Sequence, residues 1–168
     1  MGSDSDLSTM SAAAKVLEEF GISSEIRVLS AHRTPFQVVA WVGSAEAGGT
    51  KVFIAGAGVS AALPGVVAAH TACPVIGVPL TSRNSAAGGL DAILSIVQMP
   101  PGVPVATVSL DGAKNAGILA AEIIGAGDAE VRERVRVYKK KMTDDILAKD
   151  GKLQEKGAKA YLEESGIV

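Results

Sequence analysis

Ser30-Ala31-His32-Arg33-Thr34-Pro35 is the stretch from which the fold can be worked out, and it holds one of only two histidines in the chain. It directly follows residues 24–29, in which Ile26 and Val28 alternate with charged side chains. Such alternation indicates a half-exposed β-strand, and a proline often opens a helix. The stretch therefore marks a strand-to-helix turn, and ligands of open α/β sheets bind at the carboxyl ends of strands. Because an imidazole titrates near neutrality, His32 is the candidate proton carrier.

Short apolar strands and helices alternate along residues 1–127. Besides residues 24–29, apolar runs predict strands at 51–55, 74–80 and 103–110. Helical spacing of apolar residues, with Gly21 closing the first segment, predicts helices at 7–20, 35–48, 63–72, 90–97 and 115–124. This alternation predicts an α/β fold, in which helices cover both faces of a parallel sheet.

Length, composition and charge narrow the class of protein. A chain of 168 residues that is 48% hydrophobic is long enough for one domain with a sizeable core. Its formal net charge of −2, with no basic patch among aromatic residues, argues against a nucleic-acid partner. The sequence has no apolar run of membrane-spanning length and no secretory leader. The single cysteine, Cys73, can form no internal disulfide, so we expect a cytoplasmic protein that does not use a membrane.

Charged residues are concentrated in residues 128–168, which hold 10 of the 16 Lys and Arg and 9 of the 18 Asp and Glu. One apolar stripe runs along this charged helix, at Val131, Val135, Tyr138 and Met142. A further amphipathic helix is predicted at 151–168. We expect one domain with a core of residues 1–127 and a helical tail, residues 128–168, that packs on neighbouring subunits and covers the charge-poor faces.

Three stretches, residues 2–6, 30–35 and 56–60, fall at predicted strand-to-helix turns, so the fold brings them to one edge of the sheet. Together they offer hydroxyls and amides for a phosphate, a guanidinium that can grip it with two hydrogen bonds, a carboxylate for sugar hydroxyls, and an imidazole. The side chains are Ser3, Ser30, Arg33, Asp6 and His32. They predict a site for a nucleoside monophosphate, in which His32 moves a proton to or from the substrate.

Each of these features has a simpler alternative. Residues 3–6 could do no more than cap a helix, and a lone histidine such as His32 often only hydrogen-bonds its own loop. His70, in an alanine-rich helix, is interpreted as structural. Residues 56–58 superficially match a dinucleotide fingerprint, but Ala61 stands at the third glycine position and we reject the match. The sequence spaces no His, Asp, Glu and Cys group as metal ligands, so we expect no metal.

Four ordered motifs carry a resemblance over residues 1–145. They are Met1-Gly2-Ser3-Asp4-Ser5-Asp6, Ser30-Ala31-His32-Arg33-Thr34-Pro35, Ala55-Gly56-Ala57-Gly58 with Leu63-Pro64-Gly65, and Ser95-Ile96-Val97-Gln98-Met99-Pro100. In these motifs the chain closely resembles the family of 5-(carboxyamino)imidazole ribonucleotide mutases, the catalytic subunits of bacterial phosphoribosylaminoimidazole carboxylase in purine biosynthesis. Motifs this specific outweigh the simpler alternatives.

The resemblance implies a flavodoxin-like three-layer α/β/α sandwich with a C-terminal helical tail, assembled as a homo-octamer that works without a metal or organic cofactor. It implies that a carbamate on the exocyclic nitrogen of the substrate breaks down to carbon dioxide and aminoimidazole ribonucleotide. Carbon 4 of the imidazole then attacks the trapped carbon dioxide. The carbamate is labile, which favours a hand-over from the ATP-dependent synthetase that supplies it.

The resemblance also implies roles for individual residues. His32 matches the general acid/base, which protonates the departing nitrogen and later takes the proton from carbon 4. Ser3, Ser30 and Arg33 match positions around the phosphate, and Asp6 matches the ribose contact. Gly58 and Ser60 would border the carbon dioxide pocket and exclude water from it.

At its start the chain departs from the family pattern. Family members usually begin with an apolar strand ahead of the motif at residues 2–6, whereas here Met1 begins the motif itself. That strand is central in a flavodoxin-like sheet. We therefore expect that the first strand is missing from residues 1–127, and that its loss is severely destabilising.

Two further departures concern the site. Ala62 replaces a histidine that usually precedes Leu-Pro-Gly, which resembles the related class that carboxylates aminoimidazole ribonucleotide directly with carbon dioxide, and the loop at 81–89 is longer than usual. Asp4 and Arg33, where that class has serine and lysine, favour the mutase. A third alternative is a nucleotide-binding module that has lost turnover.

Overall fold

The computed structural model describes residues 1–166 and contains a parallel sheet with the strand order β1-β2-β3. The strands are β1 (Phe53–Gly58), β2 (Val75–Leu80) and β3 (Ala106–Thr107). β1 and β2 pair along their whole length, with Phe53 opposite Val75 and Gly58 opposite Leu80. All of β2 is buried, as a parallel strand between two helical layers must be.

One face of the sheet is covered by α2 (Pro35–Ala47), α3 (Leu63–Ala68) and α4 (Leu90–Val97). Pro35 and Pro64 stand in the first turns of α2 and α3, where the absent N–H would have no helical partner in any case. The strands and helices meet in a core of mostly aliphatic side chains, which includes Val38, Val42, Phe53, Leu63, Val67, Val75 and Ile96.

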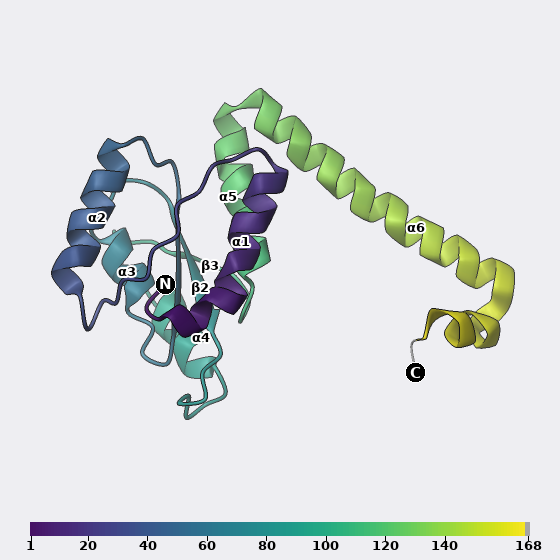
Figure 1. Ribbon diagram of the computed structural model, residues 1–168, viewed down its shortest axis with the longest axis horizontal. Helices are drawn as coiled ribbons and strands as arrows, with labels where there is room; N and C mark the ends of the chain where they lie inside the picture. The colour runs from purple at the N-terminus through teal and green to yellow at the C-terminus, as the bar shows by residue number, and fades with distance from the viewer. Residues whose placement is uncertain (167–168) are drawn as a thin grey trace.

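The opposite face is covered by α1 (Leu7–Glu19) and α5 (Ala113–Gly127), which lie across the strands from α2 and α3 in Figure 1. A short 3-10 helix, η1 (Asp4–Asp6), leads into α1. α1 and α5 pack very closely at Gly117, because a Cβ there would lie 2.4 Å from Val16 Cγ1 and 2.8 Å from the carbonyl oxygen of Ala13. Helices on both faces confirm the predicted three-layer α/β/α sandwich.

The long helix α6 (Ala129–Ser165) leaves the body of the molecule and carries the C-terminus away from it (Figure 1). Asp128 caps the helix by accepting hydrogen bonds from the N–H groups of Glu130 and Val131, at 2.9 and 3.1 Å. Near this end, Val131 and Val135 of the predicted stripe are buried against Phe20, which directly follows α1. The first turns of α6 are therefore part of the core.

Farther along, α6 extends away from the other described elements (Figure 1). Met142, Ile146 and Leu147 are exposed, and the helix kinks at Gly157, where φ is 75°. This part includes the helix predicted at 151–168, of which residues 167 and 168 lie outside the described part of the chain. Within residues 1–166, no helix is long and apolar enough to span a membrane.

Two predicted strands are corrected by the structure. Residues 24–29 are not a β-strand, and β3 is much shorter than the run predicted at 103–110. Among the described residues, only Met1 hydrogen-bonds the backbone of residues 24–29: its amino group donates to Arg27 O at 3.0 Å, and Leu29 N donates to Met1 O at 2.8 Å. The strand prediction for residues 24–29 is therefore wrong, because alternation shows which side chains could be buried, whereas a strand also needs a partner along its length.

The close approach of α1 and α5 predicts that Gly117→Ala is destabilising. The added methyl group meets the backbone of Ala13, which cannot move aside, so we expect the free energy of unfolding to fall by about 1–3 kcal/mol. The matched control is Gly43→Ala in α2, where no atom lies within 4 Å of the added Cβ. That change should stabilise the protein by about 0.5–1 kcal/mol, because alanine loses less entropy in a helix. Urea unfolding of both variants measures the two effects, and equal shifts would contradict the prediction.

Candidate active site

A cavity of about 930 Å³ lies at the carboxyl ends of β1 and β2, within the size range of small-molecule sites. The three turns predicted from the sequence, residues 2–6, 30–35 and 56–60, all contribute to its wall. Every predicted site residue lines it: Ser3, Asp6, Ser30, His32, Arg33, Gly58 and Ser60. The structure thus brings together side chains that are up to 57 positions apart in the sequence.

Arg33 ties two of these turns together. Its Nη2 donates a hydrogen bond of 2.6 Å to the carbonyl oxygen of Gly2, and its Nε lies 3.4 Å from Ser30 Oγ. The Arg33 backbone N–H also donates to Ser30 Oγ, at 3.2 Å. A guanidinium has five N–H donors, so others remain for an anion in the cavity.

The loop that carries His32 is held by Thr34. Thr34 Oγ1 accepts a hydrogen bond from Ser30 N at 2.8 Å and donates to Ser30 O at 3.1 Å, while Thr34 N donates to the same oxygen at 2.8 Å. His32 is exposed on this loop, and no group among residues 1–166 hydrogen-bonds its ring. The simpler alternative of a histidine that fixes its own loop is therefore not supported.

Residues 3–6 cap η1 and line the cavity at the same time. Ser3 is the N-cap: its Oγ accepts from Ser5 N at 3.3 Å, and the Asp6 carboxylate accepts from Ser3 N at 3.3 Å. The capping alternative is thus confirmed as geometry, yet Ser3, Ser5 and Asp6 all face the cavity. Unpaired N–H groups at a helix start suit a phosphate, so capping and anion binding are compatible here.

The turn after β1 is tight and strained. A Cβ at Gly58 would lie 3.0 Å from the carbonyl oxygen of Leu80, so glycine lets β1 and β2 end side by side. Val59 follows with φ of 58°, a conformation that a β-branched residue rarely adopts. Both residues line the cavity, together with Ser60 and Ala62. Backbone strain of this kind often accompanies functional sites.

The sequence analysis missed the wall formed after β2. Thr81, Ser82, Arg83 and Asn84 also line the cavity. The loop is anchored by Asp111, whose carboxylate accepts from Thr81 N at 2.9 Å and from Thr81 Oγ1 at 2.8 Å. The signal was available, because β2 is parallel to β1 and must end at the same edge of the sheet.

His70 does not line this cavity. His70 Nδ1 lies 2.8 Å from Val66 O in α3, which agrees with its structural interpretation. Within residues 1–166, no group of three or more His, Cys, Asp or Glu is placed to hold a metal ion.

Comparisons with known proteins give a consistent result. The family model described as AIR carboxylase matches residues 1–145. The chain is 53% identical to the N5-carboxyaminoimidazole ribonucleotide mutase of Thermotoga maritima, over 96% of this chain and 94% of the relative. It is 50% identical to the mutase of the same name from Mycobacterium tuberculosis, over 95% of this chain and 90% of the relative. The solved structure of Treponema denticola PurE is 36% identical and superposes with a TM-score of 0.83, covering 91% of this chain and 94% of the other.

The strain at Val59 predicts that Val59→Gly stabilises the protein. Relief of the left-handed conformation is worth about 1–2 kcal/mol, and the larger chain entropy of glycine offsets about 0.5–1 kcal/mol of it. We expect the free energy of unfolding in urea to rise by the difference. Val66→Gly, in the regular backbone of α3, is the control and should lower it. A destabilised Val59→Gly variant would show that the side chain contributes more than the strain costs.

Proposed function

Because the chain belongs to the AIR carboxylase family, we propose that it converts 5-(carboxyamino)imidazole ribonucleotide to 5-amino-4-imidazolecarboxylate ribonucleotide, the mutase step for which its relatives are named. The reaction belongs to purine biosynthesis. The observation that carries the proposal is the cavity that collects hydroxyls, a guanidinium, a carboxylate and an imidazole with no hydrogen-bond partner among residues 1–166 at one sheet edge. Relatives at about half identity over nearly the whole chain support the same conclusion.

In this proposal the phosphate of the substrate lies among Ser3, Ser30 and Arg33, where hydroxyls, N–H groups and a guanidinium are all within one cavity. Asp6 accepts hydrogen bonds from the ribose hydroxyls. These contacts hold the substrate at its remote end, so that binding energy positions the imidazole against His32.

His32 carries the proton in both halves of the reaction. It first protonates the exocyclic nitrogen as the carbamate breaks down to carbon dioxide, and it then takes the proton from carbon 4 after that carbon attacks the carbon dioxide. The exposed position of His32 on its loop, free of hydrogen bonds among residues 1–166, supports this role. Gly58 and Ser60 border the place where carbon dioxide is held, and keep water from it.

We further propose that the active form is a homo-octamer in the cytoplasm and that the labile carbamate is handed over from the synthetase that makes it. The single cysteine of the chain supports a reducing compartment. Exposed apolar side chains on α6 and α2 support assembly, because Ile146, Leu147 and Phe36 are 62%, 63% and 83% exposed in the isolated chain.

A paired assay tests the function. Formation of the carboxylated product is followed from the carbamate and, separately, from aminoimidazole ribonucleotide with bicarbonate or carbon dioxide. We expect faster turnover of the carbamate at low carbonate. Turnover only with free carbon dioxide would instead assign the direct carboxylation that Ala62 leaves open, and no turnover in either assay would leave a nucleotide-binding module.

The two histidines provide a matched pair for the same assay. His32→Asn should lower kcat by about 10²–10⁴ while nucleotide binding is kept, because only the proton transfer is lost. His70→Asn should leave kcat unchanged, since the His70 ring lies against Val66 O and His70 does not line the cavity. Equal effects of the two substitutions would contradict the role of His32.

Assembly is tested on α6. The double variant Ile146→Asp, Leu147→Asp should lower the mass measured by light scattering below that of an octamer, because charges replace apolar side chains at the contact. Thr143→Asp, Gln154→Asp adds the same charge at exposed polar positions of the same helix and should leave the mass unchanged. A mass unaffected by both double variants would exclude this part of α6 from the interface.

A further inference from the structure

Arg83 brings a second guanidinium to the wall of the candidate active site. Among residues 1–166, no hydrogen bond or ion pair engages its side chain. Arg33, the other arginine of the wall, is already bonded to Gly2 O and Ser30 Oγ. A guanidinium carries a fixed charge and five N–H donors, so all the donors of Arg83 remain for an anion in the cavity.

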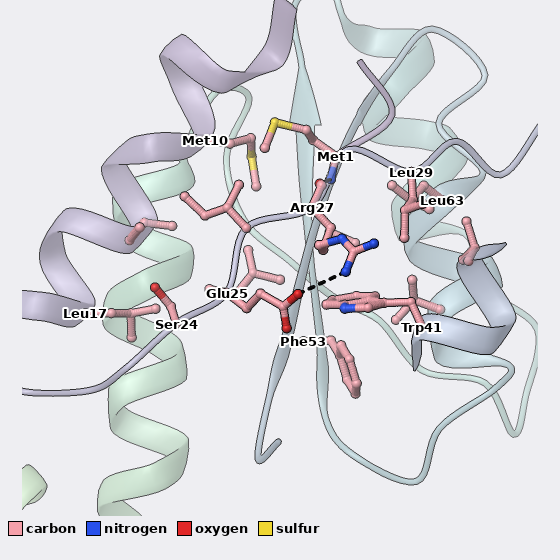
Figure 2. A pocket seen from close by; sticks show the side chains of 17 residues that line it. Met1, Met10, Leu17, Ser24, Glu25, Arg27, Leu29, Trp41, Phe53 and Leu63 are labelled. Atoms are coloured by element: carbon pink, nitrogen blue, oxygen red, sulfur yellow. Dashed lines mark hydrogen bonds and ion pairs between the residues drawn. The ribbon is translucent and has the colours of Figure 1, made fainter. Parts of the chain in front are cut away.

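Two of the turns that line the candidate site lie beside the free side of β1. Met1 and residues 24–29 share a second, mostly apolar cavity with Phe53 of β1, and within the described part of the chain no residue of β2 lines it (Figure 2). The turns at residues 2–6 and 30–35 continue directly from these two segments. Because β2 pairs with the opposite side of β1, these two turns stand on the side of β1 that faces away from β2.

The loop that carries Arg83 lies on the other side of β1. It follows β2, and it comes very close to Gly58, the last residue of β1. A Cβ at Gly58 would lie 3.0 Å from Leu80 O and 3.4 Å from Ser82 Cβ. The turn after β1 therefore stands between the two turns described above and the loop of Arg83.

This order of turns separates the two anionic groups of the substrate in the proposed function. The phosphate lies among Ser3, Ser30 and Arg33, and the carbon dioxide that leaves the carbamate is held beside Gly58. Because Gly58 adjoins the loop of Arg83, Arg83 is the arginine next to the carbamate, and Arg33 is the arginine next to the phosphate.

Hydrogen bonds fix the backbone that carries Arg83. Thr81 donates to the Asp111 carboxylate from its N–H and from its hydroxyl, at 2.9 and 2.8 Å. Asp111 has φ of 56°, in the left-handed region that aspartate tolerates better than most residues. Beyond Arg83, Ser85 N donates to Ser82 O at 3.1 Å and closes a turn. Arg83 is thus presented from a loop that is held on both sides, which lowers the entropy cost of binding an anion there.

We propose that Arg83 recognises the carbamate of the substrate and the carboxylate of the product, and that Asp111 is the positioning residue of its loop. The inference rests on the proposed function and deepens it, because it names the group that distinguishes the two alternative reactions. A guanidinium binds a carbamate or a carboxylate with two parallel hydrogen bonds, whereas aminoimidazole ribonucleotide and carbon dioxide bring no negative charge to this end of the site. Arg83 therefore selects the carbamate over the uncharged pair of reactants.

The contact belongs to the bound substrate and product rather than to the step between them. The negative charge leaves the carboxyl group when carbon dioxide forms, and it returns when carbon 4 attacks. An interaction made only with the charged ground states lowers KM without raising kcat. We expect Arg83→Gln to raise KM for the carbamate while kcat does not fall, which separates this role from that of His32.

Equilibrium binding to the full chain tests the inference without turnover. Calorimetry gives Kd for the carboxylated product and for aminoimidazole ribonucleotide, which differ only in the carboxylate. Arg83→Gln should raise Kd for the carboxylated product by about tenfold and leave Kd for aminoimidazole ribonucleotide unchanged. Arg83→Lys keeps the charge without the planar fork and should give an intermediate Kd. Arg136→Gln, the same change at an exposed position of α6 outside the cavity, is the matched control and should alter neither Kd.

The role of Asp111 is tested by a double-mutant cycle. Asp111→Ala should raise Kd for the carboxylated product when Arg83 is present, but should add nothing in the Arg83→Gln chain, because Asp111 acts through Arg83. Asp111→Asn keeps one acceptor oxygen for Thr81 and should recover part of the affinity. An equal loss for both nucleotides in Asp111→Ala would show a general structural role and overturn this part of the proposal.

Two results with Arg83→Gln would overturn the main part. An equal rise in Kd for both nucleotides would place the guanidinium at the phosphate, and unchanged Kd for both would leave it without a ligand. Failure of the proposed function gives a different result, because the unsubstituted chain would then bind neither nucleotide, and the inference would fall with it.

Discussion

The complete burial of β2 between two helical layers is the constraint on which the rest of the structure depends. Each of its six residues is shielded on both faces, so its backbone groups must be paired within the sheet. Parallel pairing with β1 meets that need, and parallel strands require helical crossovers that return the chain to the same end. All turns that follow strands therefore open at one edge. The turns that follow β1 and β2 line the candidate site at that edge.

Arg33 links two of the turns at this edge of the sheet through hydrogen bonds. The Gly2 turn leads into α1 on one face of the sheet, and the Ser30 turn leads into α2 on the other. The hydrogen bonds from Arg33 to Gly2 O and Ser30 Oγ span both turns and hold them against a single cavity. The same guanidinium is proposed to meet the phosphate. In that proposal structural and binding roles share one side chain, and the two hydrogen bonds preorganise the site for the substrate.

Much of this could be predicted from the sequence, because turns and caps are local. Helix α2 begins where Pro35 predicts, and all seven predicted site residues line the cavity. What could not be predicted is non-local. Residues 24–29 alternate as a strand should, yet pairing decides whether a strand forms, and only one rung is present among residues 1–166. The wall at residues 81–84 could have been predicted from the end of β2 at the same sheet edge, although its loop has no recognised motif.

Met1 and Gly2 connect residues 24–29 to the candidate site. Met1 donates a hydrogen bond to Arg27 O and accepts one from Leu29 N, and Gly2, the next residue, holds Arg33 through its carbonyl oxygen. Local stability follows such contacts, so order in the turn at residues 2–6 depends on the hydrogen bonds of Met1 as much as on the bonds within the turn.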